Sequence, residues 1–152
     1  MIDNMEIIFI IDGVSAICWC GLSARKGDEG METGIIGLGK MGLHIALNMQ
    51  SSWIRAYGYD IQTGPRKQAK AKGIPVVQTL QELIAALQKP RIIWLMLPAG
   101  DITESMVHQL AELLEEGDYV IDGRNSFYRD SLRNYEFLEK KKIHFYDAGT
   151  SG

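Results

Sequence analysis

The stretch Gly34-Ile35-Ile36-Gly37-Leu38-Gly39-Lys40-Met41-Gly42 decides the fold of this chain. A short apolar run leads into Gly-x-Gly-x-x-Gly, and Leu43 to Met49 have the spacing of an amphipathic helix. A strand, a glycine turn and a helix in this order are typical of a dinucleotide-binding unit. We therefore expect a dinucleotide cofactor here, with a ligand-free glycine turn as the alternative.

Each glycine of the motif has a separate physical role. Gly37 allows the tight turn, Gly39 lets the backbone approach a pyrophosphate, and Gly42 lets the helix pack closely on the strand. The helix N-terminus adds unpaired N–H groups and the positive end of the helix dipole. The candidate cofactor-binding residues of the turn are Gly37, Leu38, Gly39, Lys40, Met41 and Gly42.

A second strand is expected to end in an acidic residue. The run from Trp53 to Asp60 has strand character, and Asp60 follows Gly37 by 23 residues. A carboxylate at about this distance accepts the adenosine ribose hydroxyls and repels a 2′-phosphate, so Asp60 favours NAD over NADP. The alternative is an aspartate that starts a turn. Arg66 and Lys67 lie close in sequence and keep NADP open.

The bulk composition limits the class of protein. A length of 152 residues allows one domain with a core, and the net charge of −3 gives no general basic surface for nucleic acid or anionic membranes. Cys18 and Cys20 are too few and too close for a disulfide framework or a zinc site. We expect a cytoplasmic protein with neither a nucleic-acid nor a membrane partner.

The first thirty residues differ from the rest. Asp12 and Gly13 interrupt their apolar patches, and Asp3 and Glu6 stand where a signal peptide needs positive charge. We expect residues 1–30 to be an atypical leader outside the fold and residues 31–152 to form the dinucleotide-binding domain. Our hypothesis is that Met31 is the natural start, with a weakly ordered native arm as the alternative. An intact mass that includes residue 1 would contradict the hypothesis.

Strand and helix candidates alternate from Gly34 onward. The strand candidates are Gly34–Gly37, Ile54–Asp60, Ile74–Val77, Arg91–Leu97, Tyr119–Asp122 and Ile143–Asp147. This alternation predicts an α/β fold with a doubly wound parallel sheet, and right-handed crossovers favour the strand order 3-2-1-4-5-6. Ligands would then gather at the carboxyl ends of the strands.

Several helices carry their own start or spacing signals. Thr79-x-x-Glu82 is a capping-box pattern, and Asp101-x-x-Glu104 could open a helix in the same way. Leu132, Tyr135 and Leu138 mark the last helix.

Four segments carry a family resemblance. They are Gly37–Gly42, Leu97-Pro98-Ala99-Gly100-Asp101, Asp122-Gly123-Arg124-Asn125-Ser126 and Gly149-Thr150-Ser151-Gly152. The set resembles the N-terminal NAD(P)-binding domain of decarboxylating 6-phosphogluconate dehydrogenase over roughly residues 31–152. Asp60 resembles the NAD-preferring branch, because the NADP-preferring branch typically has Asn-Arg-Thr there. The resemblance implies a Rossmann fold as a single coenzyme domain, without the helical domain through which the family dimerises.

The resemblance also implies roles for individual residues. It implies cofactor binding by Leu97, Pro98, Ala99 and Asn125, and substrate binding by Asn125, Ser151 and Gly152. Leu97 to Ala99 would line the nicotinamide, and Asn125 would lie between the nicotinamide and the sugar acid. Asn125-Ser126 is also a plain helix start, and the last three residues are also a plain loop.

The family reaction oxidises the C3 hydroxyl of 6-phosphogluconate by hydride transfer, and loss of CO2 then gives ribulose 5-phosphate in the pentose phosphate pathway of gluconate use. The family's catalytic lysine and glutamate would lie beyond the last residue of this sequence. We therefore assign no catalytic residue and expect the chain alone to be inactive. A stand-alone NAD(P)-binding module, a remnant and another β-hydroxyacid dehydrogenase are the alternatives.

Two residues depart from the family pattern. Arg124 stands where a second glycine is usual, and if its φ is positive it would strain the turn by about 1–2 kcal/mol. Arg124→Gly would then raise stability or cofactor affinity. His44 stands where an asparagine is common, and a lone histidine there is more often structural than catalytic.

Overall fold

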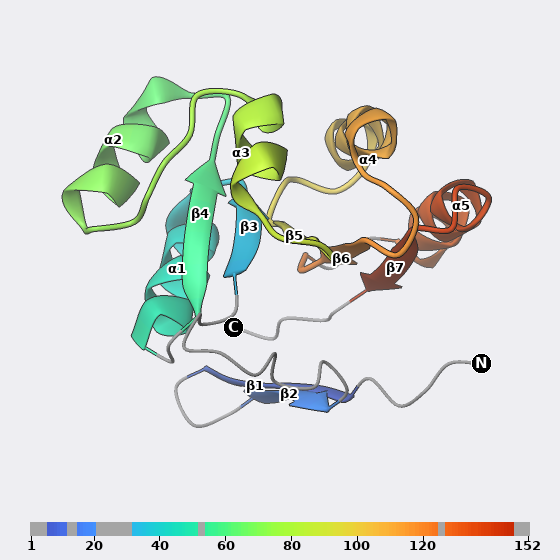
Figure 1. Ribbon diagram of the computed structural model, residues 1–152, viewed down its shortest axis with the longest axis horizontal. Coiled ribbons are helices and arrows are strands. Elements are labelled where there is room, and N and C mark those ends of the chain that lie inside the picture. The colour runs from blue at the N-terminus through green and yellow to red at the C-terminus, as the bar shows by residue number, and fades with distance from the viewer. Residues whose placement is uncertain (1–5, 12–14, 21–31, 52–53, 125–126, 148–152) are drawn as a thin grey trace.

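The computed structural model describes residues 6–11, 15–20, 32–51, 54–124 and 127–147, with side chains from Glu32 onward. The elements are β1 (Glu6–Ile11), β2 (Ser15–Cys20), β3 (Glu32–Ile36), α1 (Lys40–Ser51), β4 (Arg55–Tyr59), α2 (Thr63–Ala71), α3 (Leu80–Ala86), β5 (Ile92–Leu95), α4 (Asp101–Leu113), β6 (Tyr119–Asp122), α5 (Tyr128–Glu139) and β7 (His144–Asp147). Helices follow strands along the chain from β3 onward, as the sequence predicts (Figure 1).

A five-stranded sheet in the order β4-β3-β5-β6-β7 forms the centre of the fold, and each pair of neighbours is parallel. This confirms the doubly wound parallel sheet. The predicted strand Ile74–Val77 is wrong, because the structure has only an isolated parallel bridge there, between Gly58 and Val76. Pro75 lies inside this segment and has no N–H for a ladder. The bridge forms on the side of β4 that faces away from β3, which is where the predicted strand order places its third strand.

Alternate residues of the strands point to two apolar layers. One layer joins Ile93, Leu95 and Val120 to residues of α3, α4 and α5, and the other joins Ile35 and Ala56 to residues of α1 and α2. Figure 1 shows α3, α4 and α5 side by side along one face of the sheet. Because both faces are apolar, the strands read as continuous hydrophobic runs rather than as alternating ones.

The carboxyl ends of the strands lie level with one another. In the parallel registers, Ile36 pairs with Tyr59 and with Leu95, Leu95 pairs with Asp122, and Asp122 pairs with Asp147. The loops that follow these residues therefore start at one edge of the sheet, where the sequence predicts ligand binding.

Helices α3 and α4 begin where the sequence predicts, but only α3 has the predicted side-chain cap. The Thr79 side chain accepts a hydrogen bond from the Glu82 N–H at 3.1 Å, which confirms the predicted cap of α3. Helix α4 begins at Asp101, but its N-cap is Gly100, with φ of 96° and no side-chain cap. The Thr103 hydroxyl instead donates to the Pro98 carbonyl at 2.8 Å and ties the preceding loop to the helix.

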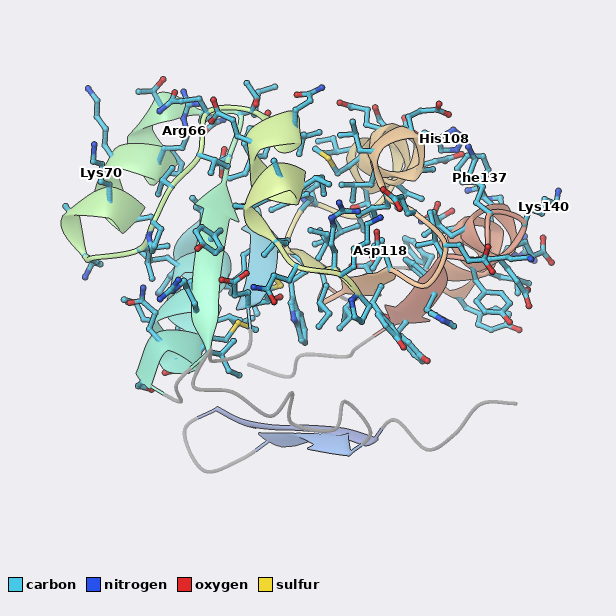
Figure 2. The ribbon with its side chains drawn as sticks, viewed as in Figure 1. Arg66, Lys70, His108, Asp118, Phe137 and Lys140 are labelled. Atoms are coloured by element: carbon cyan, nitrogen blue, oxygen red, sulfur yellow. The ribbon has the colours of Figure 1, made fainter. Side chains whose placement is uncertain are left out.

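Helix α5 forms where predicted, but two of the residues that marked it are exposed. Leu138 is buried, whereas Leu132 and Tyr135 are each 41% exposed. Polar Ser131 is buried instead, because its hydroxyl donates to the Asp147 carboxylate at 2.8 Å at the end of β7. The ring of Phe137 stacks on His108 with centroids 4.0 Å apart and joins α5 to α4 (Figure 2).

The leader contains two strands, β1 and β2, which pair antiparallel in a sheet of their own. Neither is a strand of the five-stranded sheet, which begins with β3 in chain order. The division into residues 1–30 and 31–152 stays a prediction. Among the described residues, no helix is both long and apolar enough to cross a membrane.

Candidate functional site

The glycine turn lies between β3 and α1, and two of its glycines are required by the protein's own packing. Gly37 has φ of 99°, and a Cβ there would lie 2.5 Å from the Met96 carbonyl oxygen. A Cβ at Gly42 would lie 1.8 Å from the Gly37 carbonyl oxygen. These separations are far below van der Waals contact, so the first glycine permits the turn and the third permits close packing of the helix.

Gly39 differs from the other two glycines. Apart from its two chain neighbours, no atom of the described residues lies within 4 Å of a Cβ built at Gly39, and its φ is not positive. Packing therefore does not require a glycine here. The position is exposed and faces open space, which suits close approach of a ligand to the backbone.

The start of α1 offers donors to an anion. Among the described residues, none accepts a hydrogen bond from the backbone N–H of Gly39, Lys40 or Met41, and these three residues are exposed. The dipole of the 12-residue helix α1 adds partial positive charge at this end. The open space at Gly39 and these N–H groups together fit the pyrophosphate of a dinucleotide.

Asp60 follows β4 and is hydrogen-bonded to the turn. One carboxylate oxygen, Oδ2, accepts from the Leu38 N–H, and the other, Oδ1, accepts from the Gln62 N–H, both at 2.8 Å. An ionised carboxylate has about four acceptor positions, so roughly two stay open for ribose hydroxyls. Asp60 is partly exposed, and those positions can be reached from solvent.

Arg66, on α2, is held by neighbouring side chains. Its Nη1 donates to Gln78 Oε1 and its Nη2 donates to Thr63 Oγ1, both at 3.2 Å (Figure 2). A 2′-phosphate would have to compete with these acceptors for the guanidinium. Lys67 is exposed on the same helix.

The loop after β5 runs beside the glycine turn. The Leu97 side chain comes within 3.2 Å of the place where a Cβ of Gly37 would be. Pro98 and Ala99 are exposed at this edge, and the Thr103 hydroxyl holds the Pro98 carbonyl. The structure thus brings the Leu97–Ala99 loop and the glycine turn together, although about 60 residues of sequence separate them.

The segment after β6 lies next to this loop. The Gly123 N–H donates to the Leu95 carbonyl at 2.9 Å, and a Cβ at Gly123 would lie 2.5 Å from the Met96 sulfur. The Arg124 N–H donates to the buried Asp122 carboxylate at 3.1 Å. Among described non-glycine residues only Lys142 has positive φ, so the suspected strain at Arg124 is absent. We therefore withdraw the gain in stability expected for Arg124→Gly.

The proposed substrate residues fall elsewhere. Asn125, Ser151 and Gly152 lie outside the described residues, so their roles stay predictions. Sequence reasoning also missed one residue of the site, Gly58 in β4, whose missing side chain makes room for Leu38 of the turn. A glycine inside a strand often marks a close approach, and that signal was present in Tyr57-Gly58-Tyr59.

Comparisons with known proteins place this chain in a family. The family model for the NAD-binding domain of 6-phosphogluconate dehydrogenase matches residues 32–152. The NAD(+)-dependent, decarboxylating 6-phosphogluconate dehydrogenase of Bacillus subtilis (strain 168) is 38% identical over 123 residues, covering 78% of this chain and 26% of that protein. The decarboxylating enzyme of Candida albicans is 39% identical over 135 residues, covering 86% of this chain and 25% of that protein.

Solved structures agree with the fold. The 6-phosphogluconate dehydrogenase of Plasmodium falciparum, solved apo, with its cofactor NADP+ and with its substrate, superposes with a TM-score of 0.72 at 27% identity, over 75% of this chain and 26% of that one. A 3-hydroxyisobutyrate dehydrogenase of Mycobacterium tuberculosis superposes with a TM-score of 0.74 at 21% identity, over 81% of this chain and 41% of that one, which shows the fold alone.

The chain spans about a quarter of the length of the two curated relatives described above. Its matches to them lie at 38–39% identity, and the family model extends over the whole five-stranded sheet and the glycine turn. The chain therefore belongs to the 6-phosphogluconate dehydrogenase family and carries that family's NAD-binding domain.

Proposed function

We propose that this chain binds NAD in preference to NADP, as the coenzyme domain of a decarboxylating 6-phosphogluconate dehydrogenase. The observation that carries the proposal is the contrast among the three glycines of the turn. Packing accounts for Gly37 and Gly42, whereas Gly39 faces open space beside backbone N–H groups that no described residue accepts from. A site for the cofactor pyrophosphate accounts for all three.

Two further parts of the dinucleotide, the adenosine ribose and the nicotinamide end, are each assigned to one group of residues. Asp60 has acceptor positions for the adenosine ribose, and Leu97, Pro98 and Ala99 form a wall beside the turn for the nicotinamide end. When bound, NAD supplies the hydride acceptor, and the protein's residues bind and orient it. Following the family, we assign Asn125, Ser151 and Gly152 to the sugar acid.

The preference for NAD is supported by two groups that follow β4 in the chain, Asp60 and Arg66. The Asp60 carboxylate lies beside the turn, where its charge would repel a 2′-phosphate. The guanidinium of Arg66, the nearest candidate partner for such a phosphate in sequence, already donates to Thr63 and Gln78. The named Bacillus subtilis relative is NAD(+)-dependent, which agrees with this preference.

Calorimetric titration of the full chain with NAD and, separately, with NADP tests the proposal. We expect saturable binding with the lower Kd for NAD, and we expect Asp60→Asn to reduce the ratio of the two Kd values about tenfold, because an uncharged amide does not repel the 2′-phosphate. Tighter NADP binding by the parent chain would overturn the role of Asp60. Binding of neither nucleotide to folded protein would overturn the proposal itself.

The enzymatic reaction is the larger proposal. As part of the family, the protein would oxidise 6-phosphogluconate and release CO2 to give ribulose 5-phosphate in the pentose phosphate pathway, in a cytoplasmic dimer. We assign no catalytic acid or base to this chain and expect it alone to be inactive. NADH formation from 6-phosphogluconate by the purified chain, followed at 340 nm, would contradict that expectation.

A further inference from the structure

Gly58 is the fourth of the five residues of β4 and is buried against the glycine turn. A Cβ at Gly58 would lie 2.9 Å from both δ-carbons of Leu38 and 3.4 Å from its γ-carbon. Carbon atoms normally approach to about 3.5–4.0 Å, so the Leu38 side chain already fills the space that a side chain at position 58 needs.

The backbone of β4 is held on both sides at this point. The Gly58 N–H donates to the Pro75 carbonyl at 2.8 Å, and the Gly58 carbonyl accepts from the Val77 N–H at 3.0 Å. On its other side, Gly58 is in register with Ile35 of β3. Because both sides are bonded, an added methyl group at position 58 is not relieved by a shift of the strand.

Leu38 has equally little freedom. Its side chain is 1% exposed and belongs to the apolar layer that includes Ile45, Ala46 and Ala69. Interiors at this density have few voids, so its methyl groups move away from position 58 only if its backbone also moves. That backbone carries the N–H that Asp60 holds at 2.8 Å.

We propose that Gly58 is a positioning residue of the cofactor turn. The Leu38 side chain occupies the space that a side chain at position 58 would need, and this packing keeps the Leu38 N–H hydrogen-bonded to Asp60. Leu38 lies between Gly37 and Gly39, so its position also sets the direction of the N–H groups at the start of α1 from which no described residue accepts a hydrogen bond. Gly58 acts through Leu38 and is not assigned a contact with the cofactor. For its effect on affinity, this inference rests on the proposed binding of NAD.

The test compares Gly58→Ala with Gly64→Ala in the full chain. Gly64→Ala adds the same methyl group on α2, where no described atom outside the chain neighbours and the helix's own backbone lies within 4 Å, and it serves as the matched control. We expect Gly58→Ala to raise the Kd for NAD about tenfold and to speed amide hydrogen exchange at Leu38 in the nucleotide-free protein, with both quantities unchanged in Gly64→Ala. An unchanged Kd and unchanged exchange in folded Gly58→Ala would overturn the inference.

A second variant separates positioning from a general loss of structure. In a Leu38→Ala background the clash is removed, so we expect Gly58→Ala to change the Kd for NAD less than about twofold. The same fold-change in the Kd for NAD in both backgrounds would contradict the proposed packing of Leu38 on Gly58. If Gly58→Ala alone does not fold, folding of the double variant supports the clash, and failure of the double variant beside a folded Leu38→Ala contradicts it.

Failure of the proposed function has a different signature. If the parent chain binds neither NAD nor NADP, the cofactor proposal fails, while Leu38 amide exchange still reports on the contact between positions 38 and 58. Faster exchange in Gly58→Ala then supports the positioning of the turn, and unchanged exchange overturns it.

Discussion

Asp118 and Asp60 stand at opposite ends of the parallel strands, and both carboxylates accept hydrogen bonds from backbone N–H groups. Asp118 directly precedes β6, is 1% exposed, and accepts from the N–H of Arg91 at 2.8 Å and of Glu115 at 2.9 Å, and from the Arg91 guanidinium at 3.2 Å (Figure 2). Asp60 follows β4, is partly exposed and accepts from two N–H groups.

The difference between the two ends lies in what the protein leaves unpaired. At the amino end, Asp118 accepts three hydrogen bonds and is buried beside the charge of Arg91, so the cluster stabilises the sheet and has little left to offer a ligand. At the carboxyl end, Asp60 keeps acceptor positions and the start of α1 keeps donors, because the glycine turn and the loops hold them toward solvent. Unpaired polar groups at a rigid edge favour binding.

The largest expected effect concerns the amino end. Asp118→Ala removes a buried carboxylate and leaves Arg91 without its buried partner, so we expect the free energy of unfolding to fall by about 3–5 kcal/mol. Urea titration measures it. The exposed carboxylate Glu115 of the same cluster serves as the control, and Glu115→Ala should change stability little. Equal losses in the two variants would show that burial does not distinguish them.

The next effect concerns packing within the turn. Gly42→Ala places a Cβ 1.8 Å from the Gly37 carbonyl oxygen, which is backbone and cannot rotate away. We expect a loss of about 1–3 kcal/mol in the free energy of unfolding, together with weaker NAD binding. Thermal or urea unfolding with and without NAD measures both. A fully stable Gly42→Ala variant would mean that α1 does not pack on the turn as the structure has it.

Gly39→Ala sharpens the comparison, because it separates binding from stability. Beyond the chain neighbours of Gly39, no atom in the described part of the chain lies within 4 Å of the new Cβ, so we expect the free energy of unfolding to stay within about 0.5 kcal/mol of the parent value. The methyl group would stand where the pyrophosphate approaches, so the Kd for NAD should rise about tenfold or more. Unchanged affinity would place the pyrophosphate elsewhere.

The smallest expected effect concerns the exposed ion pair between Lys89 and Glu115, near the amino ends of the strands. A hydrogen bond from Lys89, helped by the charges of Lys89 and Arg91, lowers the pKa of Glu115 from its ordinary value of 4.5. A lowered pKa in the folded state stabilises above the ordinary value, and this stabilisation is lost as the pH falls through the lowered pKa. Lys89→Ala should raise the pKa of Glu115, measured by NMR titration, and should slightly lower stability at pH 7 but not in strong acid.

Local patterns predicted the elements around the glycine turn well. The glycine turn, the helix after it and the acidic end of the next strand depend on residues within one βαβ unit, and the structure places all three where the sequence predicts. The cap of α3 is also local, since Thr79 and Glu82 are three residues apart.

Patterns that depend on neighbours were less informative. The segment 74–77 has strand composition, but Pro75 limits it to a bridge with β4. Leu132 and Tyr135 have helical spacing and yet stay exposed, because Ser131 is turned toward Asp147 of the neighbouring strand. Spacing along one helix does not report which side the sheet will cover.

The sequence by itself determined the family, the doubly wound parallel sheet and the glycine turn, because a positive φ, a helix start and an apolar strand are properties of short segments. Only the tertiary structure decided that packing requires Gly37 and Gly42 but not Gly39, and that Asp60 holds the Leu38 N–H. It alone decided that Gly58 makes room for Leu38. The contacts of Gly37 with Met96, of Leu38 with Asp60 and of Gly58 with Leu38 join residues about 20 to 60 positions apart, and their distances follow from how strands and helices pack together.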